Sequence, residues 1–529
     1  MKKNAWVASR RAALKTFLAS LAGAGLPVQA AATDALVRHL LPTASDTQLS
    51  ITLSLWQARS VLTLLMGPRK IIGTKVDSEG FHWTFQVSAL TPGTTYELQL
   101  ADDKGPIYEP WPLKTLPARE SLPESLTLLA FTCAGGGDGF GDGRRQFFKP
   151  HTFRQRMFEH ALARNPDIAI AIGDHIYWDL RGGEAPWFGR NPAALALKYG
   201  EFDRTLPMLG TVNEAVLKRV GGEQIADLYG TRFRSTPIYF VSDDHDYFEN
   251  DDAEAEIVTF PADAFSQRAH ATMAKLFYPA LPDAPVSSMA RSFGTLRYGR
   301  LFEAPMFDCA GHMSLGGETA SLVPAEIEHW LVSRAAQSEA LHFALVPSHP
   351  FGWTAGKWRE WYPDVVAPEN YTGVVMNNLL GDTQGALTTK AQKYLWQVGW
   401  WQQHQRVLRA LSQRSGSRFT FSGDIHAQGA VALTKSDELD LGKHPVQSLL
   451  VGPVSTSDVT WPSAARGIAA ALPTQLSAES IVATKEVNGF TMFRFTPTQA
   501  TAELYDCGGF DRTKGEDGRP QNIQRVRLT

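Results

Sequence analysis

Five apolar residues lead directly into an aspartate and a tyrosine in Ile168-Ala169-Ile170-Ala171-Ile172-Gly173-Asp174-His175-Ile176-Tyr177. The apolar run has the length of a strand, and its continuous pattern is typical of a strand that is covered on both faces. Four other short apolar runs end in the same abrupt way, at residues 126–131, 238–241, 343–346 and 419–421. The sequence therefore predicts several buried strands whose ends carry chemically reactive side chains.

Helical patterns lie between these runs, at residues 153–164 and 390–411. Strands that alternate with helices predict a layered α/β domain, in which ligands bind beyond the carboxyl ends of the strands. We expect one site there, formed by the residues that follow the five runs: Cys133, Asp174, Tyr177, Asp244, His245, Asp246, His349, Asp424 and His426.

These residue types predict a metal centre. Carboxylates favour hard cations, imidazole suits several transition metals, and a thiolate prefers a softer or ferric centre. Two ions about 3.5–4 Å apart would share one ligand, and Asp174 is the natural bridge. Each residue alone could instead be a cap or a turn former, and residues 243–252 could be a solvated acidic loop. Six carboxylates packed around one histidine without a cation would repel one another, so the joint pattern favours metal.

The first 32 residues predict an export signal of the twin-arginine type. An apolar stretch at residues 16–26 is preceded by five basic residues and followed by small residues. The basic residues are Lys2, Lys3, Arg10, Arg11 and Lys15. This stretch is shorter than the roughly 20 residues that a membrane-spanning helix needs, so we expect no permanent membrane anchor. We expect the twin-arginine machinery to export the chain to the periplasm or the medium.

Composition describes a globular protein, with 43% hydrophobic and 20% charged residues in 529. This length exceeds that of one ordinary domain. Loss of the signal would remove five basic side chains and lower the formal net charge from −3 to −8. An acidic protein is a poor match for nucleic acid, so we expect no stable nucleic-acid partner.

Short alternating runs between residues 44 and 116 predict a small β-sandwich. Residues 90–98 resemble the tyrosine corner of fibronectin-type domains, in which a tyrosine hydroxyl, here that of Tyr96, bonds to upstream backbone. Prolines at positions 110, 112 and 117 indicate a linker. The predicted organisation is a signal at 1–32, a β-sandwich at 33–118 and a catalytic domain at 119–529.

Three cysteines cannot form a closed set of disulfides. Cys309 and Cys507 could pair in an oxidising compartment, or each could be a small buried residue, which is the interpretation that we favour.

The order of the motifs resembles the calcineurin-like metallophosphoesterases, and more closely their alkaline-phosphatase-D (PhoD-like) branch. The resemblance spans most of the chain and rests on the export signal, the β-sandwich and the segments Phe131-Thr132-Cys133, Gly173-Asp174-His175-Ile176-Tyr177, Asp243-Asp244-His245-Asp246 and Ser422-Gly423-Asp424-Ile425-His426. It implies a four-layer α/β/β/α catalytic domain. It also implies that Cys133 and Tyr177 ligate Fe³⁺, that Asp174 bridges to a second site, and that Asp244 and Asp424 hold Ca²⁺ or another divalent ion there, with His426 completing the cluster.

Two segments depart from this pattern. Residues 346–350 resemble the histidine loop of the wider superfamily more than the alkaline-phosphatase-D branch, so His349 could change the identity of the second metal. His175 also replaces a residue that is usually polar in that branch. The glycine-rich segment 135–141 is either a flexible turn or a loop whose backbone approaches a phosphate.

The sequence thus predicts hydrolysis of phosphomonoesters, phosphodiesters or both, by a hydroxide that bridges two metals. His245 would protonate or orient the leaving oxygen and Asp246 would help to hold its ring. Arg144 and Arg145 could bind substrate oxygens, although a surface role is the more ordinary one. The alternative is an exported, metal-stabilised protein that binds a glycan or partner through aromatic residues such as Trp353, Trp358, Trp361, Trp400 and Trp401.

Overall fold

The computed structural model of the chain describes residues 36–141, 146–181, 192–251, 258–362, 365–366, 386–387, 396–457, 459–466, 468–508 and 518–528. The predicted export signal and the candidate substrate ligands Arg144 and Arg145 lie outside these residues. Within them, no helix has the length and apolar character needed to cross a membrane.

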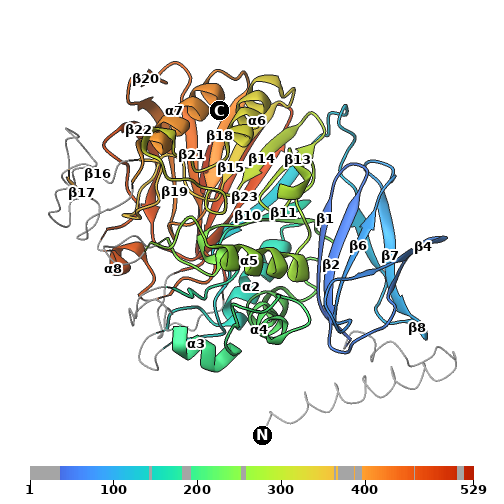
Figure 1. The fold of residues 1–529 in the computed structure, drawn as a ribbon. Helices are drawn as coiled ribbons and strands as arrows, with labels where there is room; N and C mark the ends of the chain where they lie inside the picture. The colour runs from blue at the N-terminus through green and yellow to red at the C-terminus, as the bar shows by residue number, and fades with distance from the viewer. Residues whose placement is uncertain are drawn as a thin grey trace, which may run out of the picture.

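The N-terminal strands form two antiparallel sheets, drawn in blue in Figure 1. One has the order β1 (Val37–Ala44), β2 (Leu49–Leu55), β6 (His82–Val87), β5 (Thr74–Lys75). The other has the order β4 (Arg69–Ile72), β3 (Thr63–Met66), β7 (Thr95–Asp102), β8 (Gly105–Pro106), and β9 (Trp111–Lys114) also pairs with β7. The hydroxyl of Tyr96 accepts a hydrogen bond of 2.9 Å from the backbone N–H of Thr91, which confirms the contact expected of a tyrosine corner.

A six-stranded sheet contains three of the predicted apolar runs. Its order is β12 (Ile238–Val241), β11 (Ile168–Ile172), β10 (Leu126–Thr132), β23 (Gly489–Thr496), β24 (Gln499–Asp506), β25 (Asn522–Leu528). The first three strands are parallel to one another, so their carboxyl ends lie at one edge. The last three come from the end of the chain and are antiparallel to their neighbours.

The other two runs lie in an eight-stranded sheet. Its order is β13 (Phe293–Tyr298), β14 (Phe302–Phe307), β15 (His342–Pro347), β18 (Ser417–Ser422), β21 (Val446–Val451), β19 (Gln428–Ser436), β20 (Leu439–Asp440), with β22 (Leu476–Lys485) beside β19. Strands β14, β15, β18 and β21 are parallel, so β15 and β18 also present their carboxyl ends together.

Alternate side chains of β10 pack on different partners, which explains its continuous apolar pattern. Leu128 and Ala130 share a core with Phe419 and Phe421 of the eight-stranded sheet. Leu129 and Phe131 pack instead with residues of α2 (His151–Leu162), α4 (Val212–Gly221) and α5 (Ala264–Phe277). A third cluster joins the outer face of β15 to α6 (Ala325–Gln337) and α7 (Val398–Ser412). The predicted mixed α/β class is confirmed, and α7 begins at Val398 rather than near residue 390.

Shorter elements complete the described chain: α3 (Pro192–Tyr199), η1 (Gly222–Asp227), η2 (Asp244–Tyr247), η3 (Ser287–Met289), η4 (Gly317–Thr319), β16 (Val365–Val366), β17 (Ala386–Leu387) and α8 (Pro462–Ala465).

Two buried histidines join the N-terminal strands to α5. His39 of β1 places Nδ1 2.6 Å from the hydroxyl of Ser54, and its Nε2 donates to the carbonyl of Phe277 at 3.0 Å. His82 of β6 donates from Nδ1 to the carbonyl of Leu276 at 3.1 Å. Both side chains are shielded from water. This burial lowers the pKa of His39 to about 3 and that of His82 to about 4.

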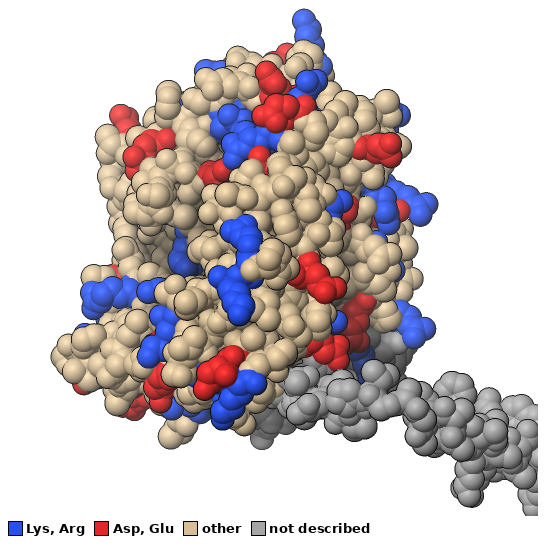
Figure 2. Space-filling view, turned by 90° about the vertical axis from the view of Figure 1, so that its right-hand side faces the viewer, with Lys and Arg blue, Asp and Glu red and all other residues tan. Residues whose placement is uncertain are grey.

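The surface on the N-terminal side carries both signs of charge. Figure 2 shows the side that lies on the right of Figure 1, where lysine and arginine side chains lie among aspartate and glutamate side chains.

Cys133, Cys309 and Cys507 are all buried, and no disulfide joins them, which confirms the interpretation of Cys309 and Cys507 as small buried residues.

Candidate metal centre

The two large sheets meet at the edge where their parallel strands end. Thr132, the last residue of β10, forms a parallel bridge with Pro453, just after β21. Its hydroxyl donates to the carbonyl of Ile172 at the end of β11. Gly423 follows β18 and lies so close to Thr132 that any side chain there would collide with it. This close approach brings loops that are nearly 300 residues apart in sequence to one place.

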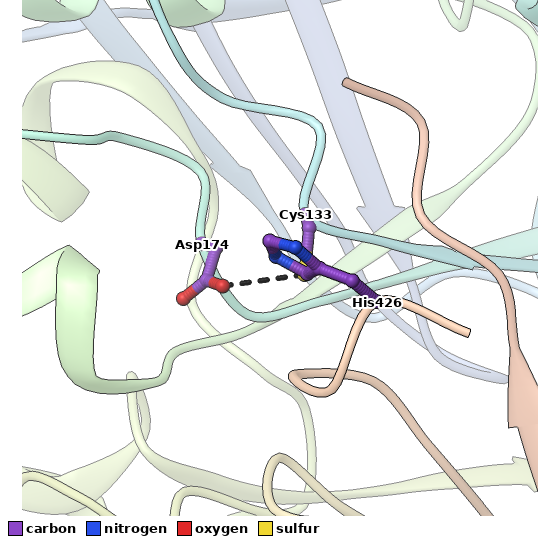
Figure 3. A group of neighbouring side chains, drawn as sticks. All are labelled: Cys133, Asp174 and His426. Carbon is purple, nitrogen blue, oxygen red and sulfur yellow. Dashed lines mark hydrogen bonds between the residues drawn. The ribbon is translucent and has the colours of Figure 1, made fainter. Parts of the chain in front are cut away.

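Four predicted site residues lie together in the first cluster, which consists of Cys133, Asp174, Tyr177 and His426. The Sγ of Cys133 is 3.2 Å from Oδ2 of Asp174, and the hydroxyl of Tyr177 donates to the same oxygen at 2.8 Å. The Tyr177 hydroxyl is also 3.2 Å from Nε2 of His426. Figure 3 shows Cys133, Asp174 and His426 pointing toward one another from three loops.

Backbone conformation marks the same loops. Among the described residues, nine that are not glycine have positive φ, and four of these belong to the site: Cys133, Asp174, Asp424 and His426. Such conformations are strained for residues with a Cβ atom, and they gather where structure serves function. The positive φ of these four residues therefore accompanies the turn by which each strand end directs its side chain into the common site.

The first cluster fits a metal cation. Burial raises the pKa of the Cys133 thiol and of the Tyr177 phenol well above their ordinary values, and the neighbouring Asp174 raises both further. Burial also raises the pKa of Asp174 to about 6. The Oδ1 of Asp174 is buried and accepts no hydrogen bond from the described chain. A thiol, a phenol, a carboxyl and an imidazole within reach of one another form a donor set that suits a transition-metal cation.

His245 is held by Asp179 and not by Asp246. Its Nδ1 lies 2.8 Å from Oδ1 of Asp179. Although burial acts to lower it, the carboxylates of Asp179, Asp244 and Asp174 raise the pKa of His245 to about 10. Asp246 instead accepts hydrogen bonds from the backbone N–H groups of Asp174, His175 and Asp243, at 3.1, 2.8 and 2.9 Å. The predicted role of Asp246 in orienting the ring is thus wrong, because its carboxyl fixes the loops instead.

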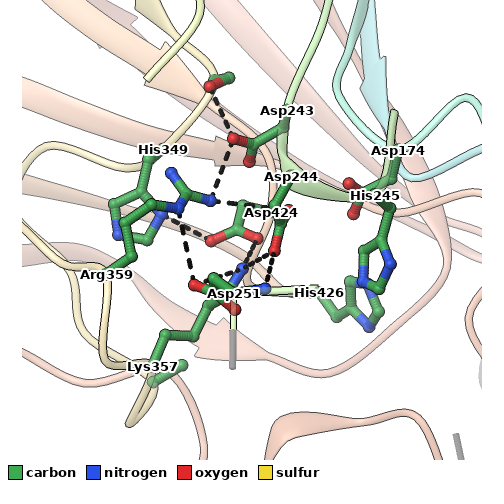
Figure 4. A network of polar contacts seen from close by, with 12 residues as sticks. Asp174, Asp243, Asp244, His245, Asp251, His349, Lys357, Arg359, Asp424 and His426 are labelled. Carbon is green, nitrogen blue, oxygen red and sulfur yellow. Dashed lines mark hydrogen bonds and ion pairs between the residues drawn. The ribbon is translucent and has the colours of Figure 1, made fainter. Parts of the chain in front are cut away.

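The remaining predicted ligands, Asp244, His349 and Asp424, lie in a second cluster. His349 is fully buried with Nδ1 2.7 Å from Oδ2 of Asp424, and Asp243 is close to both. Two cationic side chains that sequence reasoning missed, Lys357 and Arg359, lie among the acidic residues (Figure 4). Although burial opposes it, Lys357 lowers the pKa of Asp244 and of Asp424, so both are carboxylates.

A small cavity opens between the two clusters. It has a volume of about 30 Å³, enough for at least one water molecule. Its lining includes Asp174, His245, Lys357 and His426, together with Arg466 after α8. Arg466 makes no salt bridge with any other described residue, and no sequence pattern singles it out.

The start of the glycine-rich segment is held by hydrogen bonds to the rest of the chain, and its approach to a phosphate stays a prediction. The carbonyls of Ala134, Gly135 and Gly136 each accept a 2.9 Å hydrogen bond from the buried guanidinium of Arg154. The N–H of Gly136 donates to Gln224 in η1 at 2.8 Å. These groups therefore hold the loop that carries Cys133, and its described glycines are part of the scaffold.

The tryptophans that motivated the binding alternative are mostly core residues. Trp353, Trp358, Trp361 and Trp400 are each at most 5% exposed and belong to the cluster beneath α6 and α7. They present no aromatic surface to a glycan.

Comparisons with known proteins support the fold. No protein-family model matches the sequence, and no curated protein sequence matches it. A solved structure of PhoD has 13% sequence identity and a TM-score of 0.58, and the alignment covers 92% of this chain and 88% of that one. The purple acid phosphatase PPD1 from yellow lupin (Lupinus luteus) seeds has 11% identity and a TM-score of 0.50, over 92% of this chain and 73% of that one.

These likenesses show that the chain shares its fold with PhoD and with the purple acid phosphatase PPD1. The chain has a PhoD-like fold, so the resemblance seen in the sequence is confirmed at the level of the fold.

Proposed function

We propose that this chain is an exported, metal-dependent phosphoesterase that hydrolyses phosphomonoesters, phosphodiesters or both in a four-layer α/β/β/α domain. One observation carries the proposal: Cys133, Asp174, Tyr177 and His426 converge from three loops on one buried point beside a cavity. We propose that they hold iron. The predicted twin-arginine signal supports export of the chain.

When bound, a cation at this point supplies positive charge that lowers the pKa of water and neutralises a phosphoryl group. The chain's own residues supply the remaining functions. Asp179 engages Nδ1 of His245, which leaves Nε2 for the substrate. The raised pKa of His245, about 10, keeps the imidazole protonated at neutral pH, so it can donate a proton to the leaving oxygen.

Lys357 and Arg466 line the cavity and would pair with the phosphoryl oxygens. Because most of the side chains that line the cavity are buried, these interactions are stronger than they would be in water. Arg144 and Arg145 lie outside the described residues, so their proposed contact with substrate rests on the sequence alone.

The test is substitution of Asp174 by alanine in protein purified after native export. We expect Asp174→Ala to lose bound iron and hydrolysis of an aryl phosphate together, because the side chain contacts both Cys133 and Tyr177. Elemental analysis and a panel of phosphomonoesters and phosphodiesters provide the two readouts. Full iron content with full turnover in this variant would refute the proposal.

Arg525→Ala is a suitable control, because this exposed side chain pairs with Glu503 on β24, away from the site. Its iron content and turnover should match those of the unmodified protein. If the unmodified protein binds metal but hydrolyses no ester, the metal stabilises the fold of a protein with another function.

A further inference from the structure

The ammonium group of Lys357 lies among three acidic side chains at the second cluster. Its Nζ is 3.1 Å from Oδ2 of Asp244, 3.3 Å from Oδ2 of Asp251, and in still closer contact with Oδ1 of Asp424. All four side chains are at most 2% exposed. Figure 4 shows the ammonium among the three carboxyl groups.

Arg359 shares two of these acidic partners, Asp244 and Asp251, and also contacts Asp243. Its Nη2 lies 3.1 Å from Oδ1 of Asp243 and 3.5 Å from Oδ1 of Asp244, and its Nε is 3.7 Å from Oδ2 of Asp251. Asp244 therefore faces Lys357 with one oxygen and Arg359 with the other. Two positive charges are thus built into the second cluster.

The loop that carries both cations is fixed by its own hydrogen bonds. The buried carboxyl of Glu360 accepts from the N–H of Ala355 at 2.8 Å and from that of Lys357 at 3.1 Å, and also from the hydroxyl of Thr354. The backbone of Thr354 pairs with Ala471. Because the backbone at Lys357 is anchored, its ammonium is positioned by the fold.

A divalent ion on Asp244 and Asp424 would need the same oxygens. Calcium binds carboxylate oxygens at about 2.3–2.6 Å, and an ion held by both residues would lie beside the Lys357 ammonium. Like charges a few ångströms apart inside a protein repel strongly. The oxygens that Asp244 and Asp424 turn toward Lys357 therefore do not fit the Ca²⁺ or other divalent ion expected on these two residues from the sequence.

We infer that the ammonium of Lys357, assisted by Arg359, takes the place of the second metal ion, so that the chain holds one metal per molecule, at Cys133, Asp174, Tyr177 and His426. This inference rests on the metal of the proposed function. Lys357 and Arg359 then give the second cluster a permanent positive charge, which a chelator cannot remove.

The experiment counts metal ions per chain by native mass spectrometry and elemental analysis, before and after titration with excess Ca²⁺. The unmodified protein should hold one metal and take up no second ion. Lys357→Ala should bind one further Ca²⁺, because the oxygens of Asp244 and Asp424 become free, and its melting temperature should rise on Ca²⁺ addition. The control Lys485→Ala, which removes an exposed lysine paired with Asp506, should behave as the unmodified protein does.

Two metals in the unmodified protein, or none, would overturn the inference. So would a Lys357→Ala variant that folds and takes up no Ca²⁺. If that variant does not fold, the count in the unmodified protein decides alone. One metal without any ester hydrolysis would contradict the proposed function and leave this inference standing, whereas two metals with hydrolysis would do the reverse.

Discussion

The orientation of His245 depends on one neighbour, Asp179, whose carboxylate lies 2.8 Å from Nδ1. A carboxylate in this position fixes the tautomer and the orientation of an imidazole. Nothing in the sequence distinguishes Asp179 from the acidic residues around His245, because the two are 66 positions apart. Proximity in sequence suggested Asp246, whose carboxyl is occupied by three backbone N–H groups.

At this scale we expect His245→Ala to keep its metal and to lose about 10²–10⁴-fold in turnover, the range typical of a general acid. Asp179→Asn should lose about 10–100-fold, since the ring stays but its orientation and charge are no longer supported. The alkaline limb of the pH–rate profile, which reports deprotonation of His245, should move to lower pH in Asp179→Asn. An unchanged profile would mean that Asp179 has only a structural role.

At the scale of elements, the contact between β1, β6 and α5 predicts how the free energy of unfolding depends on pH. His39 and His82 are neutral in the folded protein, where burial lowers the pKa to about 3 and about 4, whereas each titrates near 6.5 in the unfolded chain. The unfolded chain therefore binds more protons below pH 6.5, and the free energy of unfolding falls as the pH decreases from 6.5 toward 4.

For each of these histidines the loss amounts to about 2 kcal/mol at pH 5. We expect His39→Gln to show a smaller fall in the free energy of unfolding between pH 7 and pH 5, by roughly that amount. The exposed His444 provides the control, and His444→Gln should follow the unmodified protein. Urea unfolding at the two pH values measures the difference, and equal pH dependence in His39→Gln and the unmodified protein would contradict the prediction.

The strands themselves could be predicted from sequence because each signal is local. All five apolar runs are strands, and β11 and β12 have the predicted bounds of residues 168–172 and 238–241. The start of α7 was misplaced near residue 390, because the helix begins only at Val398, after Gln397, whose backbone is extended.

For the whole molecule, the pairing of strands and the electrostatics of the site could not be read from local patterns. Residues of β10 pair with β23, more than 350 positions later, and the sequence contains no mark of that contact. Lys357 and Arg359 resemble surface residues when considered singly. Their aromatic neighbours Trp358 and Trp361 were a signal of burial, and both are in the core.

The account depends on one buried metal at the meeting point of the two sheets. An anomalous-scattering map from crystals of the protein, recorded at the iron edge, tests this most directly. We predict a single strong peak within bonding distance of Cys133 Sγ, Asp174 Oδ2, Tyr177 Oη and His426 Nε2. A map with no peak among these four atoms, or with its main peak elsewhere in the chain, would contradict the account.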